Sequence, residues 1–264
     1  MVYFLSDAHI GSRAMDDPQH QLRFIELLNR LAPDATAFYL LGDIFDFWFE
    51  YVWHDSSKEE YAPLLDCLQT LTARGIPVHY FIGNHDIWTF GRLARRTGVI
   101  IHRSQPEVLT IAGKRCLLAH GDGLVPTDYL RHFPNDIQKK IRSFMRLRRL
   151  FHNPVAQFML RLLPPAWGNR LGYGWAKRSR LKELANPCGY KGENSEELVL
   201  YAKEQERTQH LDYYIFGHRH IELDMELASG ARVVILGDCF RQWTYAAMDE
   251  QGKLELLCIQ EQNS

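Results

Sequence analysis

Cysteine is scarce in this sequence. The 264 residues include five cysteines, Cys67, Cys116, Cys188, Cys239 and Cys258. Their number is odd, and their spacing matches neither a structural zinc site nor a disulfide framework. This pattern argues against both, and we expect a protein of the reducing cytoplasm.

Long apolar runs are also missing. No run reaches the roughly 18 to 20 residues that span a bilayer, and the first expected strand begins at Val2 with no signal peptide before it. Any membrane contact is therefore expected to be peripheral. The formal net charge is −1, and the apolar and charged fractions are ordinary for a globular protein. We expect a single domain over residues 1–264.

Metal-binding side chains occur in five short blocks, each after an apolar run. The runs are residues 2–5, 38–41, 78–82, 116–119 and 213–216, which predict buried strands ending in turns. The carboxyl ends of strands in open α/β sheets face one crevice, so the blocks are predicted to converge on one pocket. The blocks are Asp7-x-His9, Gly42-Asp43, Gly83-Asn84-His85-Asp86, His120-Gly121-Asp122 and Gly217-His218-x-His220.

The donor types in these blocks predict the class of metal. Three oxygen donors and four imidazoles, with no thiolate, fit divalent ions such as Mn²⁺, Fe²⁺ or Zn²⁺. Seven ligands suit two ions that share one carboxylate, and Asp43, alone in its block, is the expected bridge. The expected ligands of the first ion are Asp7, His9, Asp43 and His220. Those of the second are Asp43, Asn84, His120 and His218.

Apolar and turn patterns predict alternating strands and helices in the first hundred residues, with helices at about 18–31, 59–74 and 88–96. A hairpin is expected next, with strands 107–111 and 114–119 turning at Ala112-Gly113. Further strands are predicted near 213–216, 231–236, 243–248 and 253–259. The second half is thus expected to form a sheet with antiparallel strands that faces the first.

Residues 125–190, called the lid segment below, interrupt this rhythm. From Arg131 to Lys182 there are thirteen basic residues against one acid, Asp136. Apolar residues recur among them at helical spacing, which predicts basic amphipathic helices. Such helices can pack on a core with solvated charges or bind nucleic acid. We favour a third interpretation, a lid at an anionic membrane surface whose apolar face admits acyl chains.

The five blocks, in this order, resemble the calcineurin-like metallophosphoesterases, whose pattern is D-x-H, G-D-x-x-D, G-N-H-D/E, H-G and G-H-x-H. The resemblance implies a four-layer α/β/β/α sandwich with a helical lid insertion, a dinuclear centre and hydrolysis of a phosphate ester or anhydride. A pair of ions roughly 3.5 to 4 Å apart activates an attacking oxygen and clamps the phosphoryl oxygens.

Three residues beside the ligands are catalytic candidates. His85 follows the ligand Asn84, where it could stabilise developing phosphoryl charge or protonate the departing oxygen. Asp46 would orient the His85 imidazole. Asp86 either shares in catalysis or caps a helix beginning near Ile87. For both carboxylates, a catalytic and a scaffolding role remain open at this stage.

Within that superfamily, the chain is most similar to the UDP-2,3-diacylglucosamine diphosphatase branch of lipid A biosynthesis. The run from Tyr39 to Trp48 resembles its Y-I-L-G-D-L-F-E-x-W, and the run from His120 to Asp128 resembles its H-G-D-x-L-x-x-x-D. The lid segment lies at the same place. One position departs: His85 stands where that branch has arginine, in G-N-R-D.

This closer resemblance implies a substrate. The products would be UMP and 2,3-diacylglucosamine 1-phosphate (lipid X), with Mn²⁺ as the expected ion and the cytoplasmic face of the inner membrane as the location. No nucleic-acid or protein partner is expected. The alternatives are a phosphodiesterase or phosphatase acting on nucleotides or phosphoproteins and, more remotely, a non-catalytic scaffold. The expected substrate contacts are Asn84, His85, Asp128, Ser179 and His218.

Overall fold

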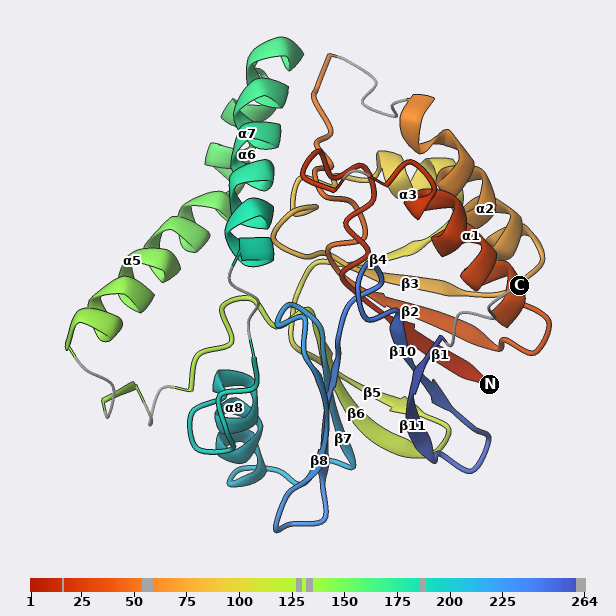
Figure 1. The fold of residues 1–264 in the computed structure, drawn as a ribbon, viewed down its shortest axis with the longest axis vertical. Coiled ribbons are helices and arrows are strands. Elements are labelled where there is room, and N and C mark those ends of the chain that lie inside the picture. The colour runs from red at the N-terminus through yellow and green to blue at the C-terminus, as the bar shows by residue number, and fades with distance from the viewer. Residues whose placement is uncertain (16, 54–58, 127–129, 132–134, 186–188, 260–264) are drawn as a thin grey trace.

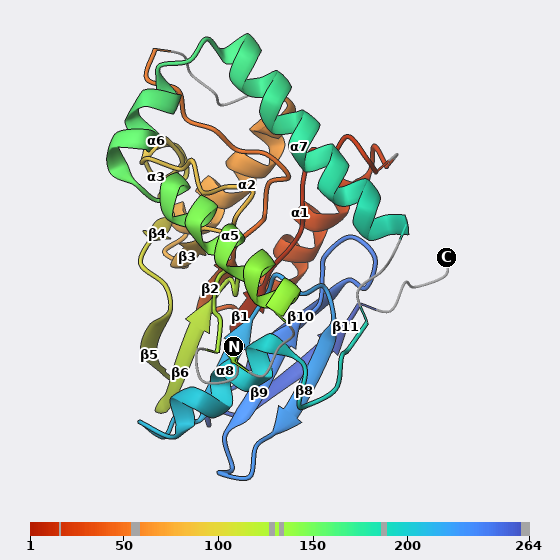
Figure 2. The same cartoon turned by 90° about the vertical axis from the view of Figure 1, so that its left-hand side faces the viewer.

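The fold is built from two β-sheets that face each other, with helices on both outer sides (Figures 1 and 2). The structure is a computed structural model that describes residues 1–15, 17–53, 59–126, 130–131, 135–185 and 189–259. This arrangement is the four-layer α/β/β/α sandwich expected from the sequence. In the described part of the chain, none of the helices is both long and apolar enough to cross a bilayer.

The first sheet has six strands in the order β11-β10-β1-β2-β3-β4. Strands β1 to β4 run parallel, and β10 and β11 are antiparallel additions at one edge. The strands are β1 (Val2–Leu5), β2 (Ala37–Leu41), β3 (Val78–Phe81), β4 (Ile100–His102), β10 (Thr244–Met248) and β11 (Leu254–Cys258).

Both faces of this sheet are buried, because successive side chains of a strand point to opposite sides. Phe38 and Leu40 of β2 pack toward the helices, whereas Tyr39 and Leu41 pack toward the second sheet. The covering helices are α1 (His20–Leu31), α2 (Ala62–Ala73) and α3 (Arg92–Thr97), and a short 3-10 turn, η1 (Glu59–Tyr61), precedes α2. Helix α1 buries Phe24, Leu27, Leu28 and Leu31, the one-sided spacing of an amphipathic helix.

The second sheet has five strands in the order β5-β6-β7-β9-β8. They are β5 (Glu107–Ile111), β6 (Lys114–Ala119), β7 (Tyr213–Phe216), β8 (Glu222–Glu226) and β9 (Arg232–Leu236), and α8 (Glu197–Glu206) covers the outer face. The predicted hairpin is confirmed. Ala112 and Gly113 both have positive φ, the backbone of a tight turn whose twist matches the flanking strands.

Three further helices lie within the lid segment: α5 (Asn135–Phe151), α6 (Pro154–Arg161) and α7 (Pro165–Ala185). Pro164 and Pro165 separate α6 from α7, since proline is tolerated in the first turn of a helix but not in its interior. Figure 2 shows α5 and α7 crossing over the end of the sandwich at which β1, β2 and β6 finish. The lid helices therefore cover the edge to which the five blocks were assigned.

Several elements differ from the prediction. Strands β4 and β8 and helix α8 were not foreseen, and the helix expected at 88–96 begins only at Arg92. Strands β10 and β11 were assigned to the sheet of the second half but pair with β1 in the first. Strand pairing depends on contacts distant in sequence, which local patterns do not encode.

Candidate metal centre

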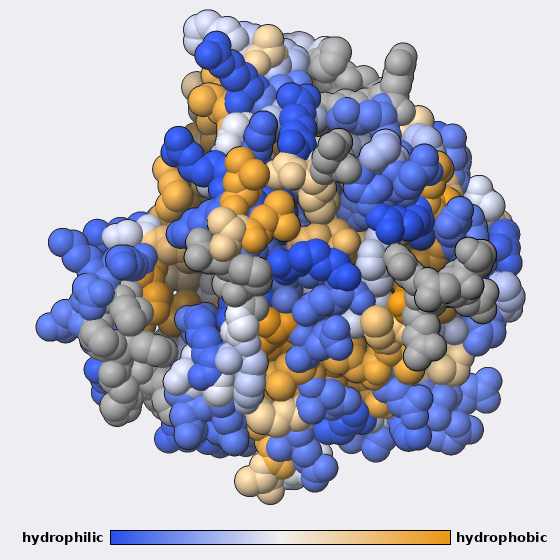
Figure 3. All heavy atoms as spheres, in the orientation of Figure 1, coloured by the Kyte–Doolittle hydropathy of each residue, from blue (hydrophilic) through white to orange (hydrophobic). Residues whose placement is uncertain are grey.

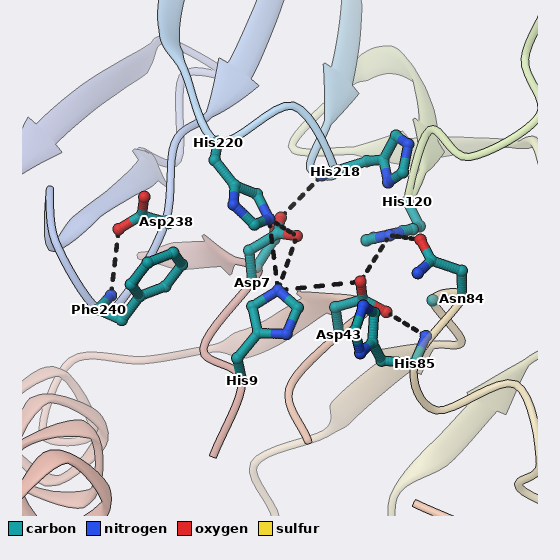
Figure 4. A network of polar contacts seen from close by, with 12 residues as sticks. Asp7, His9, Asp43, Asn84, His85, His120, His218, His220, Asp238 and Phe240 are labelled. Atoms are coloured by element: carbon teal, nitrogen blue, oxygen red, sulfur yellow. Dashed lines mark hydrogen bonds and ion pairs between the residues drawn. The ribbon is translucent and has the colours of Figure 1, made fainter. Parts of the chain in front are cut away.

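The five blocks meet in one cluster beside the carboxyl ends of β1, β2, β3, β6 and β7 (Figure 4). Among the described residues, three groups of donor atoms have ligand spacing, and within each group all atoms lie within 4.8 Å of one another. One group, His9, Asp46 and His85, includes two of the catalytic candidates. The remaining two groups consist of predicted ligands alone. One contains Asp7, His9 and His220. The other contains Asp43, His120 and His218.

The first group is a buried set of one carboxylate and two imidazoles. His220 Nε2 lies 2.9 Å from Asp7 Oδ1 and 3.3 Å from His9 Nε2. The Phe240 ring packs edge-on against both imidazoles (Figure 4). One carboxylate oxygen and two imidazole nitrogens at this spacing are donor types that divalent ions such as Zn²⁺ or Mn²⁺ accept, so this set fits a divalent ion.

Asp43 belongs to the second group and also faces His9 of the first. Its Oδ2 is 3.3 Å from His120 Nε2 and 3.9 Å from His9 Nε2, and its Oδ1 accepts a hydrogen bond from the His85 backbone N–H at 2.8 Å. Asn84 Oδ1 approaches His120 Nε2 at 3.3 Å. A carboxylate facing a ligand from each group has the position required of a bridge between two ions.

The backbone is strained at these residues. Residues other than glycine rarely adopt a positive φ, and this backbone conformation costs of order 1 to 3 kcal/mol per residue. Among the described residues other than glycine, seven have positive φ, and five of those seven are predicted ligands. They are Asp7, His9, Asp43, His218 and His220. Strain concentrated this way marks a functional site, since the surrounding fold must hold each residue in place.

Two glycines allow the loops to approach closely. A β-carbon at Gly83 would overlap the Asp43 carboxylate, and one at Gly217 would overlap the Ser6 hydroxyl and approach Asp7 Oδ2 at 2.6 Å. The His218 backbone N–H donates to Asp7 Oδ2 at 2.8 Å. Glycine at position 83 is therefore needed for its block to contact Asp43, and glycine at position 217 is needed for its block to contact Asp7.

The position of Asp46 corrects one expectation. The imidazole of His85 is held by the backbone carbonyl of Asp46, which lies 2.7 Å from Nδ1, and not by its carboxylate, which is 4.0 Å away. The carboxylate is nearer to His9, with Oδ1 at 3.3 Å from Nδ1. Asp46 thus supports a predicted metal ligand through its side chain.

Asp86 does not cap a helix, because no helix of the described chain begins near Ile87. Its carboxylate is fully buried and accepts hydrogen bonds from the Tyr80 hydroxyl at 2.6 Å and from the backbone N–H groups of Gly83 and Ile44. These contacts tie the Asn84 loop to the Asp43 loop. The helix-cap prediction was therefore wrong, and the observed contacts are those of a scaffold.

Sequence reasoning missed two residues that α7 brings to the cluster. Arg180 is 1% exposed, with Nη2 at 3.7 Å from Asp46 Oδ1 and Nη1 at 3.3 Å from His220 Nδ1. The Glu183 carboxylate contacts both His220 Nδ1 and Arg180. One signal was available: Glu183 is the first acid after Asp136, at the end of a long basic stretch.

Charge balance in the cluster follows from these contacts. Burial alone would raise the pKa of Asp7, but the facing His220 imidazole holds it well below its usual value. Burial lowers the pKa of His220, but Asp7 and Glu183 outweigh this and raise it to about 9. Asp7 is therefore ionised at neutral pH, as a carboxylate ligand must be.

A polar cleft of about 310 Å³ and an apolar cavity of about 540 Å³ adjoin at this cluster. They share Asn84, His85, Ser179 and His218. The cavity lies between the lid helices and the loops that follow β2 and β3. Its apolar lining includes Phe47, Phe49, Ile87, Trp88, Phe144, Leu147, Phe151, Leu160, Leu163, Leu171 and Trp175.

Four of the five residues predicted to contact the substrate are among the described residues. Ser179 of α7 lines both the cleft and the cavity, as do Asn84, His85 and His218. Asp128 lies outside the described residues. A further contact joins the lid to the block that contains His120: Arg148 Nε of α5 lies 2.7 Å from Asp122 Oδ2.

Comparison with known proteins places the chain in a family. The model of the calcineurin-like phosphoesterases matches residues 1–222. The chain belongs to the calcineurin-like phosphoesterase family. It is therefore a metal-dependent hydrolase of phosphoric esters or anhydrides, with Asp and His clusters able to bind metal ions.

Three curated relatives of this phosphoesterase share the name UDP-2,3-diacylglucosamine hydrolase. It is 36% identical over 260 residues to the UDP-2,3-diacylglucosamine hydrolase of Porphyromonas gingivalis, and the match covers 94% of each chain. The protein of that name from Stutzerimonas stutzeri is 28% identical over 255 residues, or 96% of each chain. The one from Neisseria gonorrhoeae is 27% identical over 236 residues, covering 89% of this chain and 88% of the relative.

Proposed function

We propose that this phosphoesterase cleaves the diphosphate of UDP-2,3-diacylglucosamine, giving UMP and 2,3-diacylglucosamine 1-phosphate in lipid A biosynthesis. One observation carries the proposal: the polar cleft with the metal-ligand cluster opens directly onto a large apolar cavity. A substrate with a charged diphosphate beside two acyl chains has the same division into a polar and an apolar part. The shared name of the curated relatives supports it.

In this proposal, two divalent ions, Mn²⁺ by preference, occupy the cluster. Asp7, His9, Asp43 and His220 hold one, and Asp43, Asn84, His120 and His218 hold the other. When bound, the ions would activate the attacking oxygen and neutralise charge on the phosphoryl group. The clustering of the donor atoms and the position of Asp43, which faces His120 of its own group and His9 of the other, support this division.

The protein's own residues would position the diphosphate. His85 lines the cleft, and its Nδ1–H donates to the Asp46 carbonyl, so the ring is fixed in orientation. We propose that His85 stabilises developing negative charge or protonates the leaving oxygen. Ser179 would contact the substrate where cleft and cavity meet, and Asp128 would contact the glucosamine.

The acyl chains would lie in the apolar cavity, which excludes water from the hydrocarbon. Three apolar residues of helix α5, Phe144, Leu147 and Phe151, line the cavity. Phe158 and Met159 instead stand more than half exposed on α6. Such side chains suit contact with a bilayer from which the substrate is drawn.

The lid surface supports peripheral membrane binding. Apolar and hydrophilic side chains alternate over it (Figure 3), and among the exposed apolar ones are Leu150, Val155 and Trp167. Basic residues of the same helices would attract the anionic surface of the cytoplasmic leaflet. We propose a cytoplasmic protein that docks on the inner membrane through the lid segment.

A product assay tests this function. UMP release is measured with Mn²⁺ from UDP-2,3-diacylglucosamine and, in parallel, from UDP-glucosamine without acyl chains. We expect strong preference for the acylated substrate. Equal rates would favour a general nucleotide hydrolase, and absence of turnover with any phosphodiester would favour a non-catalytic scaffold.

A further inference from the structure

Glu183 links the lid to the predicted metal centre. It lies near the end of α7, and its carboxylate contacts His220 Nδ1 and the Arg180 guanidinium. Arg241, in the loop before β10, adds a third contact, with Nη2 at 3.1 Å from Glu183 Oε1. The side chain of Glu183 is only 16% exposed. It is thus a mostly enclosed carboxylate with three partners.

The contact with His220 determines which ring nitrogen is available to an ion. Nε2 is directed toward Asp7 and His9, at 2.9 and 3.3 Å. Nδ1 faces Glu183, an acceptor, so the ring proton sits on Nδ1 and leaves the Nε2 lone pair free. A carboxylate on the far nitrogen of a ligand histidine orients the ring and raises its basicity.

The other imidazole of the first group has the same arrangement. His9 presents Nε2 toward Asp7 and Nδ1 toward the Asp46 carboxylate, at 3.7 and 3.3 Å. Asp46 belongs to the loop after β2, close to its ligand in the core of the fold. Glu183 plays the equivalent part for His220 but comes from the lid segment. One of the two supports therefore depends on the lid being in place.

Charge makes this support more important. The Arg180 guanidinium is buried, and its Nη1 is 3.3 Å from His220 Nδ1. A cation at that distance opposes a positive ion on the same ring. Glu183 contacts both groups and offsets that charge. Without Glu183, Arg180 would be left with Asp46 as its nearest described carboxylate, at 3.7 Å.

We propose that Glu183 is a positioning residue for His220, and that helix α7 is thereby part of the metal centre as well as a cover for substrate. This rests on the proposed assignment of His220 as a ligand. The consequence is that movement of α7 away from the cluster weakens binding of the first ion. A lid deletion would therefore damage the metal site, so point variants are the appropriate test.

The test is a Mn²⁺ titration of the metal-free full-length protein, followed by the electron paramagnetic resonance signal of free Mn²⁺. Loss of a partner to a ligand histidine typically costs about 10 to 100-fold in metal affinity. We expect that loss for one of two ions in Glu183→Ala, and a smaller loss in Glu183→Gln, whose amide oxygen still accepts from Nδ1–H. Affinity for the second ion should change by less than about two-fold.

Two controls separate positioning from lid attachment. Arg241→Gln removes a tie between α7 and the loop before β10 but leaves Glu183 on His220. Glu197→Gln neutralises a carboxylate of α8 that pairs with Lys191 at 3.0 Å. We expect both to bind two ions like the wild type. If Arg241→Gln loses the ion equally, lid attachment is responsible, and the inference is overturned.

The remaining outcomes are also decisive. Unchanged affinity for both ions in Glu183→Ala and Glu183→Gln would overturn the inference while leaving the proposed function intact. If the wild type itself binds fewer than two ions, the proposed dinuclear centre fails first. Circular dichroism of each metal-free variant shows whether it is folded, and Glu183→Gln alone carries the test if Glu183→Ala is not.

Discussion

Leu171 of α7 provides a quantitative test of the acyl-chain cavity. Its side chain lines the cavity and is 70% exposed. Full burial of a leucine contributes roughly 1.5 to 3 kcal/mol, so covering that exposed fraction with hydrocarbon is worth roughly 1 to 2 kcal/mol. Since about 1.4 kcal/mol corresponds to ten-fold, Leu171→Ser should weaken binding of the diacylated substrate by about 5 to 30-fold.

The assay is steady-state UMP release in detergent micelles, with KM compared for the acylated and non-acylated substrates. Leu181→Ser is the matched control, because Leu181 is on the same helix, is 49% exposed and is not among the residues lining the cavity. We expect KM to rise only for the acylated substrate and only in Leu171→Ser. A rise for both substrates, or an equal effect of Leu181→Ser, would refute the reasoning.

Two further variants test the site. His85→Gln should lower kcat by about 100 to 10,000-fold, the usual contribution of a positioned acid or base, while Mn²⁺ content by elemental analysis stays at the wild-type level; loss of metal would instead make His85 a structural residue. Gly83→Ala forces a β-carbon onto the Asp43 carboxylate and should destabilise the fold by about 1 to 3 kcal/mol and reduce metal content. Unchanged thermal unfolding and metal content would show that the two loops need not touch.

The convergence of the blocks could be predicted because it depends on local patterns. Each block follows a buried apolar run, and parallel strands of one sheet end at the same edge. The ends of β1, β2 and β3 belong to the first sheet and those of β6 and β7 to the second, so the packing of the two sheets completes the cluster. The layer architecture followed from the family resemblance. Strands β10 and β11 were assigned to the wrong sheet, since their pattern shows that they are strands but not which neighbour they pair with.

Residues of the lid could not be predicted in the same way. Arg180 and Glu183 lie in a basic helical stretch where position on the helix does not reveal which groups face the core. Their contacts with Asp46 and His220 depend on how α7 docks on the sandwich. Asp46 was expected beside His85 because both lie close to ligands in the sequence, but its carboxylate is nearer to His9.

The central claim is a pair of ions bridged by Asp43. Anomalous diffraction from crystals of the protein grown with Mn²⁺ tests it most directly, because the ions are located independently of any activity. We expect two peaks roughly 3.5 to 4 Å apart, one beside His9 and His220 and one beside His120 and His218, with Asp43 contacting both. A single peak, or two peaks without Asp43 between them, would contradict the account.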